Sequence, residues 1–280
     1  MEQSAAMEAQ RTVFAAVQMS SQADVGENLD LASELLREGA RRGATIALLP
    51  ENFAYFGDEA GKRAHAEELS PDACTGPIAI RLANIARELG IHVIAGGMPE
   101  RSADPDRPYN TCAVFGPDGR LAARYRKCHL FDVDLGERPY RESAATMAGH
   151  EVVAAALAGL QVGLSICYDI RFPELYRVLT ALGADVLVVP AAFTVATGKD
   201  HWHVLLRARA IEAQAYVVAA AQWGKHPLGR QTYGKSCIID PWGEVIAQAS
   251  EGEGVITAII DRAYLEQVRG SLPSLQHRKL

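Results

Sequence analysis

Three side chains that can do covalent chemistry each follow an apolar stretch of the sequence, although they lie far apart along the chain. Glu51 follows an apolar run that ends in LLP, Lys127 closes LAARYRK, and Cys167 closes QVGLSIC. In open α/β folds, ligands bind at the carboxyl ends of strands, so reactive groups are expected at such positions. Glu51, Lys127 and Cys167 are therefore the candidate catalytic residues.

Cys167 stands at the head of a dense polar cluster that contains Tyr168, Asp169, Arg171 and Glu174. A helix is predicted to begin near Pro173, because proline at the first helical position has no amide hydrogen to lose. A thiol just ahead of a helix N-terminus is expected to favour its thiolate form. The alternative interpretation is a small buried cysteine that serves packing alone.

A glutamate, a lysine and a cysteine in one pocket could hydrolyse an unactivated carbon–nitrogen bond through a thioester. Cys167 would be the nucleophile, and Glu51 could act as general base for the thiol and then as general acid for the leaving amine. Lys127 and the backbone N–H of Tyr168 could stabilise the oxyanion, with Glu142 of RPYRES as a further carboxylate. A solvated Glu51 and a surface Lys127 are the alternatives, because the sequence does not show that these residues meet.

Other chemistries have weaker support in the sequence. A Cys–His hydrolase would need a histidine near Cys167, but none of the candidates stands at a clear strand end: His129, His150, His201 and His203. The HxH pair lacks a carboxylate at ligand spacing, and no glycine-rich phosphate loop opens a helix. The sequence therefore predicts neither a metal nor an organic cofactor.

Composition indicates an ordinary globular protein. Of 280 residues, 49% are hydrophobic and 22% charged, and the net charge is −6. An acidic chain argues against nucleic-acid and membrane-surface partners, which require a basic face. The five cysteines are odd in number and never spaced as CxxC, so no disulfide framework is expected and a reducing cytoplasm is the default. Residues 1–10 are interpreted as a disordered leader, and residues 11–280 as one domain.

Hydrophobic periodicity predicts alternating strands and helices in both halves of the chain. Strands are expected at 12–19, 45–53, 91–100, 184–193, 216–224 and 255–261, and helices at 29–43, 76–90, 172–183 and 201–215. Hairpins are expected at 109–127, 157–167 and 236–248. The polar segment 129–151 is too long for an idle connection, so it is a candidate functional loop.

The two halves resemble each other, since TIALLPENF is echoed by DVLVVPAAF. Each half predicts a sheet covered on one face by two amphipathic helices. The hairpins extend each sheet without adding helices, so each sheet keeps an uncovered apolar face. Packing these two faces together gives an α/β fold with four layers, α-β-β-α, and two internally similar halves.

With these residues identified, the chain resembles the nitrilase superfamily of carbon–nitrogen hydrolases over nearly its whole length. The resemblance rests on LLPENF, YRKCHLFDVD and SICYDIRFPEL, which place the family's catalytic Glu, Lys and Cys at Glu51, Lys127 and Cys167. It implies that Glu142 supports the lysine and the substrate. It also implies the four-layer sandwich and a homodimer, or a higher homo-oligomer, formed across helices.

Within the superfamily, the chain looks most like the Nit branch associated with fragile-histidine-triad proteins. CYDIRFPEL, HWHVLLRARAIEAQAYVVAAAQWGKH and the terminal LPSLQHRK carry this likeness. It implies metabolite repair by an amidase that cleaves deaminated glutathione into 2-oxoglutarate and cysteinylglycine. The alternatives are an ω-amidase acting on 2-oxoglutaramate or 2-oxosuccinamate, another carbon–nitrogen hydrolase, or a non-catalytic binding member. The segment DLGERPY departs from the family's VPGG-like loop.

An anionic keto-acid substrate requires a cation in the pocket. Arg171 and Lys199 are the candidates for this cation, and Thr194 and Thr197 are candidate hydroxyl donors. The alternative for Arg171 is an ion pair with Glu174 or Asp169.

Overall fold

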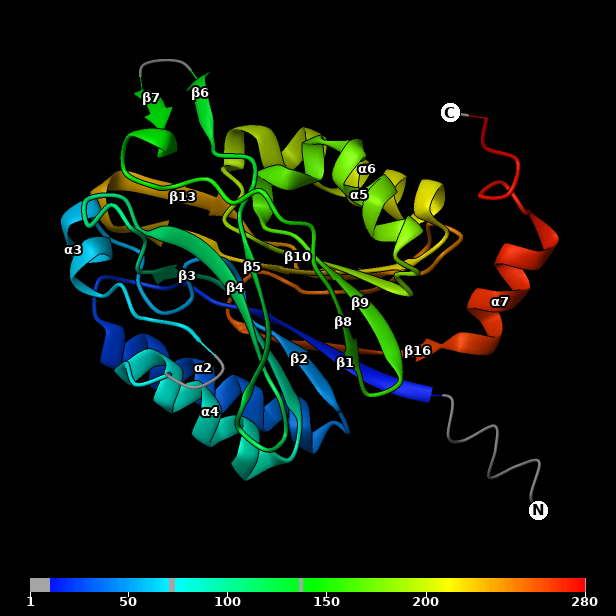
Figure 1. Cartoon of the computed structure of the whole chain (residues 1–280), viewed down its shortest axis with the longest axis horizontal. Coiled ribbons are helices and arrows are strands. Elements are labelled where there is room, and N and C mark those ends of the chain that lie inside the picture. Colours follow the sequence, from blue (N-terminus) through cyan, green and yellow to red (C-terminus); the bar gives the residue numbers. More distant parts are fainter. Residues whose placement is uncertain (1–10, 71–73, 136–137, 280) are drawn as a thin grey trace.

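The computed structural model describes residues 11–70, 74–135 and 138–279, and two six-stranded sheets dominate this part of the chain. The predicted leader, residues 1–10, lies outside the described residues. Helices cover the outer face of each sheet, so the predicted four-layer α-β-β-α sandwich is confirmed (Figure 1).

The first sheet has the order β16-β1-β2-β3-β4-β5. Its strands are β1 (Arg11–Gln18), β2 (Ile46–Leu48), β3 (His92–Glu100), β4 (Tyr109–Phe115), β5 (Leu121–Arg126) and β16 (Gly254–Asp261). Strands β1, β2 and β3 run parallel, and the remaining pairs are antiparallel. Helices α2 (Val25–Arg41) and α4 (Pro77–Leu89) cover the outer face of this sheet, below it in Figure 1.

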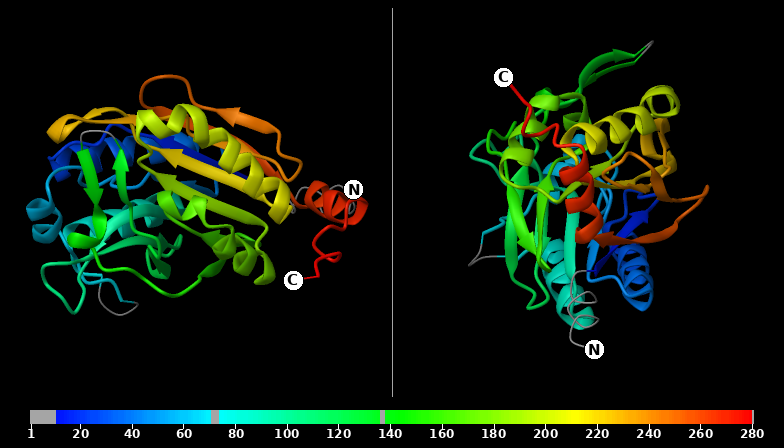
Figure 2. Two further views of the ribbon diagram at one scale, coloured as in Figure 1. Left: turned by 90° about the horizontal axis from the view of Figure 1, so that it is seen from above. Right: turned by 90° about the vertical axis from the view of Figure 1, so that its right-hand side faces the viewer.

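The second sheet has the order β15-β14-β11-β10-β9-β8. Its strands are β8 (Ala154–Leu157), β9 (Leu160–Leu164), β10 (Val186–Ala191), β11 (Tyr216–Ala221), β14 (Cys237–Ile239) and β15 (Val245–Gln248). Helices α5 (Pro173–Ala181) and α6 (Val195–Ala213) lie side by side over its outer face (Figures 1 and 2).

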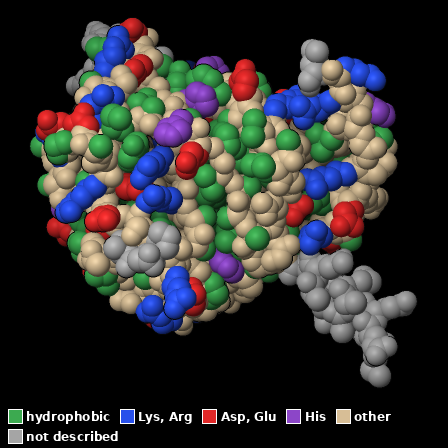
Figure 3. All heavy atoms as spheres, viewed as in Figure 1, with side chains coloured by type: hydrophobic (Ala, Val, Ile, Leu, Met, Phe, Trp, Pro, Cys, Tyr) green, Lys and Arg blue, Asp and Glu red, His purple; other side chains and the backbone are tan. Residues whose placement is uncertain are grey.

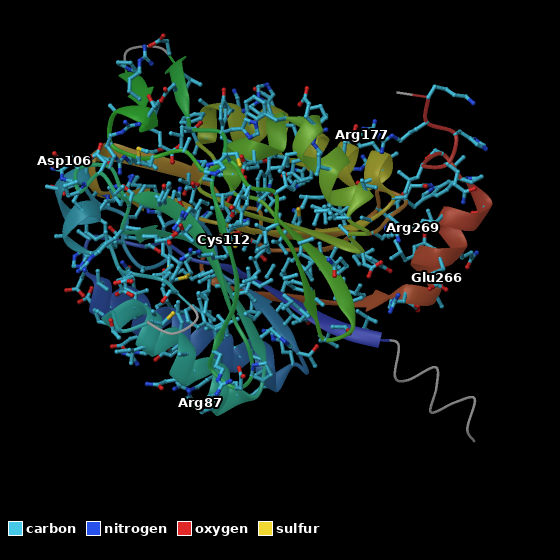
Figure 4. The ribbon with its side chains drawn as sticks, viewed as in Figure 1. Arg87, Asp106, Cys112, Arg177, Glu266 and Arg269 are labelled. Carbon is cyan, nitrogen blue, oxygen red and sulfur yellow. The ribbon has the colours of Figure 1, made fainter. Side chains whose placement is uncertain are left out.

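Alternation along β1 shows how the strands contribute to both sides of a sheet. Phe14 and Ala16 belong to the core cluster shared by the two sheets, whereas Ala15 and Val17 belong to the cluster beneath α2 and α4. This alternation follows from the two-residue period of a strand. Figure 4 places Cys112 of β4 in the middle of the molecule, between the sheets, where its side chain is fully buried.

The internal repeat extends to the strand order, with one exchange between the halves. Reading β8 as the counterpart of β16, and β9, β10 and β11 as those of β1, β2 and β3, gives both sheets the same order. The sequence assigned residues 255–261 to the second half. The structure places them in the first sheet, where β16 pairs with β1 over its full length.

Several predicted boundaries are wrong for identifiable reasons. Helix α2 begins at Val25 because Asp24 caps it by accepting from the Glu27 N–H. Asn28, predicted to precede the helix, instead lies buried inside it and donates from Nδ2 to the carbonyls of Gln22 and Ala54. Strand β2 is shorter than predicted: the Leu49 N–H still donates to the Ile94 carbonyl, but Pro50 has no N–H with which to continue the ladder.

Helix α6 begins at Val195, six residues earlier than predicted, because Thr194 caps it by accepting from the Thr197 N–H. His201 and His203 therefore lie within the helix and not at its start. The predicted functional loop 129–151 contains the hairpin β6 (Asp132–Leu135) and β7 (Arg138–Arg141), followed by the short 3₁₀ helix η1 (Glu142–Ala144).

Smaller elements complete the described chain: α3 (Glu59–Ala64), the 3₁₀ helices η2 (Cys167–Arg171) and η3 (Pro227–Gly229), the hairpin β12 (Trp223–His226) and β13 (Arg230–Tyr233), and α7 (Arg262–Ser271). Helix α7 lies at the end of the sandwich opposite the β6–β7 hairpin (Figures 1 and 2). On the face in Figure 3, basic and acidic side chains are interspersed. Among the described helices, none is long and apolar enough to cross a membrane.

Candidate active site

Glu51 lies buried at the carboxyl end of β2, where both of its carboxylate oxygens accept hydrogen bonds. Oε1 accepts from Lys127 Nζ at 3.0 Å and from Asn110 Nδ2 at 2.9 Å. Oε2 accepts from the backbone N–H of Ala192 at 3.0 Å, and this residue follows β10 of the other sheet. The Glu51 carboxylate is therefore fixed by both sheets.

The backbone of β3 passes close to Glu51 at Gly97, where the missing side chain leaves space for the glutamate. The register between β3 and β4 shifts between Ala95 and Met98, and Gly97 adopts a φ of 69°. A Cβ at Gly97 would stand 2.8 Å from Glu51 Cγ and 2.8 Å from Asn110 Oδ1. Glycine is thus required there both by the backbone conformation and by the space left for the carboxylate.

Lys127 follows β5, and its side chain is only 2% exposed. Its ammonium donates to Glu142 Oε2 at 2.8 Å in addition to Glu51. Burial alone would lower the pKa of Lys127, but the charges of Glu142 and Glu51 outweigh it and raise the pKa well above the usual value. These two carboxylates therefore favour the ammonium form of Lys127.

Glu142 is held by the start of η1. Burial would raise the pKa of its carboxyl, but the Lys127 ammonium outweighs burial, with help from Lys62 and the Phe131 N–H, and the pKa is lowered. Phe131 N donates to Glu142 Oε2 at 2.7 Å, and Asn110 Nδ2 lies 3.3 Å from Oε1. The buried cluster therefore holds one ammonium between two carboxylates.

Cys167 opens η2 just beyond β9, with a φ of 48°, a left-handed conformation that non-glycine residues rarely adopt. The turn that begins at Cys167, called the elbow below, is fixed by the buried Asp169. This carboxylate accepts from the Ile166 N–H at 2.8 Å and from Tyr125 Oη at 2.8 Å. Because Tyr125 lies two residues before Lys127, Asp169 links the cysteine turn to the strand that carries the lysine.

The expectation that a helix N-terminus favours the thiolate of Cys167 is wrong. Burial raises the pKa of this thiol well above its usual value, and the charge of Glu51 and a hydrogen bond to Glu51 raise it further. Lys127 and the Ala192 N–H act in the opposite direction but do not outweigh these effects. Five residues of 3₁₀ helix also provide little dipole. Cys167 is therefore a protonated thiol beside a carboxylate.

These four side chains meet in one cavity of about 240 Å³ at the carboxyl ends of the strands. Its lining includes the candidate catalytic and supporting residues Glu51, Lys127, Glu142, Cys167 and Tyr168. Residues separated by more than a hundred positions in sequence thus form a single site. The arrangement provides a nucleophile, a proton-transferring carboxylate and a fixed positive charge.

Of the substrate-binding candidates, Arg171, Thr194 and Thr197 line the cavity and Lys199 does not. The Lys199 side chain is 63% exposed, with its ammonium 4.0 Å from Asp200. The structure thus places Lys199 on the surface, outside the cavity.

The alternative of an ion pair between Arg171 and Asp169 or Glu174 is also wrong. Asp169 is occupied by the contacts of the elbow and by His129 Nδ1 at 2.7 Å. The Arg171 guanidinium lies 5.3 Å from the ring centre of Phe193 and 3.3 Å from His201 Nδ1. Among the described residues, no carboxylate pairs with Arg171.

The sequence reading missed several residues of the site. Asn110 is the most important, because its amide bridges Glu51 and Glu142. Asparagine inside the otherwise apolar strand YNTCAVF is a signal that could have identified it, since strands disfavour this residue. The basic side chains of Lys62, Arg141 and Arg230 also line the cavity, and only the fold brings them there.

Alternative chemistries gain nothing from the structure. None of the histidines considered for a Cys–His pair lines the cavity: His129, His150, His201 and His203. His129 instead stacks on Phe172 with ring centroids 3.7 Å apart. Within the described ranges, no group of three or more His, Cys, Asp or Glu side chains could hold a metal ion.

Comparison with known proteins identifies the family of this chain. A family model described as carbon–nitrogen hydrolase matches residues 14–270. A deaminated glutathione amidase of Synechocystis is 47% identical over 268 residues, which cover 94% of this chain and 97% of the relative. An omega-amidase of Xenopus tropicalis is 40% identical over 260 residues, 90% of each chain. The crystal structure of the C. elegans NitFhit protein superposes with a TM-score of 0.89 at 37% identity, covering 96% of this chain and 65% of that longer one.

Proposed function

The chain belongs to the carbon–nitrogen hydrolase family, and we propose that it is a thiol amidase that hydrolyses deaminated glutathione to 2-oxoglutarate and cysteinylglycine. As a member of this family it is a hydrolase of carbon–nitrogen bonds other than peptide bonds. The observation that carries the proposal is the meeting of Glu51, Lys127 and Cys167 in one cavity that also contains the guanidinium of Arg171, which pairs with no carboxylate of the described residues.

The first step is attack by the Cys167 sulfur on the amide carbonyl carbon. The thiol is protonated at rest, because burial and Glu51 raise its pKa. Glu51, already hydrogen-bonded to the thiol, takes the proton as the carbon–sulfur bond forms. The ammonium of Lys127 and the backbone N–H of Tyr168 hold the oxyanion, so charge develops against fixed donors.

In the second and third steps Glu51 acts first as a general acid and then as a general base. Glu51 gives its proton to the leaving nitrogen as the carbon–nitrogen bond breaks and the thioester forms. It then takes a proton from a water molecule that attacks the thioester carbonyl. When the carbon–sulfur bond breaks, Glu51 gives this proton to the departing sulfur, which releases the acid and restores the thiol and the carboxylate.

Glu142 and Asn110 position the charged groups during these steps. Glu142 accepts from Lys127 at 2.8 Å, so the ammonium keeps its direction when Glu51 becomes protonated. Asn110 donates to both carboxylates, which fixes the separation between them. No step requires a metal or an organic cofactor.

Arg171 binds the carboxylate of the keto-acid portion of the substrate. Its guanidinium has five donors, and the structure commits few of them to protein partners. Thr194 and Thr197 lie beside each other, with hydroxyl oxygens 3.0 Å apart, and supply further hydrogen bonds to this portion. The exposed Lys199 has no part in the pocket.

A panel of three substrates tests the proposal: deaminated glutathione, 2-oxoglutaramate and a simple nitrile. We expect the highest kcat/KM for deaminated glutathione, in line with the higher identity to the amidase of that name than to the omega-amidase. Equal turnover of the first two substrates would contradict the choice between them. A non-catalytic binding member would turn over none of the three.

The assembly and the location of the protein are also proposals. Exposed apolar side chains on α5 and α6, including Val178, Val204 and Ile211, and Leu182 directly after α5, support a homodimer formed across these helices. Light scattering should report a dimer that Val204→Glu weakens. Five free cysteines support a reducing cytoplasm. The exchange of β16 into the first sheet supports a single domain over residues 11–280.

A further inference from the structure

Apart from Arg171, two further cations form a basic wall of the cavity, Arg230 and Lys62, and the elements that carry them hold no catalytic residue. Arg230 opens β13 and Lys62 lies on α3, and both line the cavity together with Glu59. Lys62 Nζ donates to Glu59 Oε1 at 3.2 Å, and Arg230 NH2 stands 3.8 Å from the same oxygen. Two cations share one carboxylate, so the wall has a net positive charge.

Several hydrogen-bonding groups of this wall have no partner among the described residues. Arg230 has five donors but makes one hydrogen bond with the described residues, to the Gly57 carbonyl at 2.7 Å, while its guanidinium lies 5.5 Å from the ring centre of Phe56. Lys62 has three donors and uses one. The Glu59 Oε2 atom is buried and has no hydrogen-bond partner among the described residues. Buried polar atoms are rarely left in this state, so a ligand that supplies a donor is expected.

Arg141 of the β6–β7 hairpin also lines the cavity, but unlike Arg230 its guanidinium has several protein partners. Its guanidinium pairs with the exposed Asp134 and donates to the carbonyls of Val133 and Tyr140. It holds β6 and β7 together.

We propose that Arg230 and Lys62 bind the C-terminal carboxylate of a peptide-like leaving group, and that Glu59 accepts a hydrogen bond from its peptide N–H. This assignment rests on the proposed function, because deaminated glutathione carries one carboxylate on each side of the scissile amide. Arg171, which stands beside Phe193 and α6, serves the acyl side. Arg230, which stands beside Phe56 and α3, serves the leaving side.

The length of the leaving group sets how far its carboxylate lies from the scissile bond. A dipeptide in extended form spans about 7 Å, so the carboxylate of cysteinylglycine lies well away from the sulfur of Cys167. The ω-amides 2-oxoglutaramate and 2-oxosuccinamate release ammonia and have nothing to place there. The wall therefore determines specificity for peptide-like amides over simple ω-amides.

The test compares Arg230→Met with wild type on deaminated glutathione, on its C-terminal glycinamide analogue and on 2-oxoglutaramate. The analogue has an amide NH2 in place of one carboxylate oxygen, so the leaving group keeps its size but loses its negative charge. We expect the ratio of kcat/KM for the free acid to that for the analogue to fall about 10- to 100-fold, mainly through KM, as expected for loss of a charge-assisted hydrogen bond. Arg230→Lys should recover part of the ratio. Arg120→Met, at a side chain 85% exposed in the β4–β5 turn, is the matched control and should keep the wild-type ratio.

The possible outcomes distinguish the carboxylate subsite from the proposed function. A loss of equal size on all three substrates would mean that Arg230 only supports Phe56 and Gly57, which overturns the subsite. An unchanged ratio also overturns the subsite but leaves the proposed function intact if wild type still prefers deaminated glutathione. Wild type that does not turn over deaminated glutathione overturns both.

Discussion

Replacing Lys127 with methionine tests the buried charge cluster, because the side chain keeps its length while the ammonium is lost. In the native protein this ammonium stands 3.0 Å from Glu51 and 2.8 Å from Glu142, with the lysine and Glu51 buried. Removal of one partner from a buried ion pair costs about 3–5 kcal/mol, because the remaining charge is uncompensated. That is a large part of the roughly 5–15 kcal/mol by which most domains are stable.

The pH dependence gives the sharper signature. In wild type the pKa of Glu142 is lowered, so this carboxyl contributes stability that is present above its unfolded value, near 4.5, and is lost as pH falls. In Lys127→Met, burial acts without the ammonium and raises the pKa of Glu142, so the stability of the variant increases as pH falls toward 4.5. The deficit of the variant should therefore shrink between pH 8 and pH 5.5, by at most about 1.4 kcal/mol per pH unit for one group.

Urea unfolding at pH 8 and at pH 5.5 measures both quantities. Lys199→Met is the matched control, since that lysine is exposed and its loss should change the free energy of unfolding by less than about 0.5 kcal/mol. Adding Glu142→Gln to Lys127→Met should restore part of the stability, since it removes the uncompensated charge. A deficit below about 1 kcal/mol that is equal at both pH values would refute the reasoning.

Three further predictions follow from the same contacts. Gly97→Ala should lower kcat at least tenfold, because the new Cβ would stand 2.8 Å from Glu51 Cγ; steady-state kinetics with unchanged kcat would contradict this. The rate at which iodoacetamide alkylates Cys167 should still rise above pH 9, because burial and Glu51 raise the pKa of the thiol, and Glu51→Gln should shift the profile to lower pH; a plateau below pH 8 would disagree. Burial lowers the pKa of His226, so the stability that it contributes is present above pH 6.5 and lost as pH falls, by at most about 1.4 kcal/mol per pH unit. His226→Gln should flatten the stability profile between pH 6.5 and 5, and an unchanged profile would argue against it.

Local patterns in the sequence predicted much of the fold. The core strands, the helices α4 and α5 and the β4–β5 hairpin were found because hydrophobic period, Pro173 at a helix start and Gly90 at a helix end all act within a few residues. The first residues of helices that begin with a side-chain cap were harder to predict. Asp24 and Thr194 both begin their helices earlier than periodicity suggested, because a side-chain cap adds a polar first turn.

The exchange of β16 and the full set of pocket residues could not be predicted, because both depend on contacts between distant segments. Glu51, Lys127 and Cys167 could be proposed from their positions after strands. Asn110 was missed although its place inside a strand was a signal, and Arg230 could not be proposed, since its role exists only once β13 lies beside the cavity. The protonation of Cys167 likewise depends on burial and on Glu51, which outweigh the short η2 helix.

The thioester on Cys167 is the most direct test of the central claim. Wild type and Cys167→Ala would be mixed with deaminated glutathione, quenched in acid during turnover, digested and examined by mass spectrometry. We expect the 2-oxoglutaryl group on the peptide that contains Cys167 in wild type, and neither adduct nor product with Cys167→Ala. Product formation by Cys167→Ala, or an acyl group attached to a different residue such as Cys128, would contradict the account.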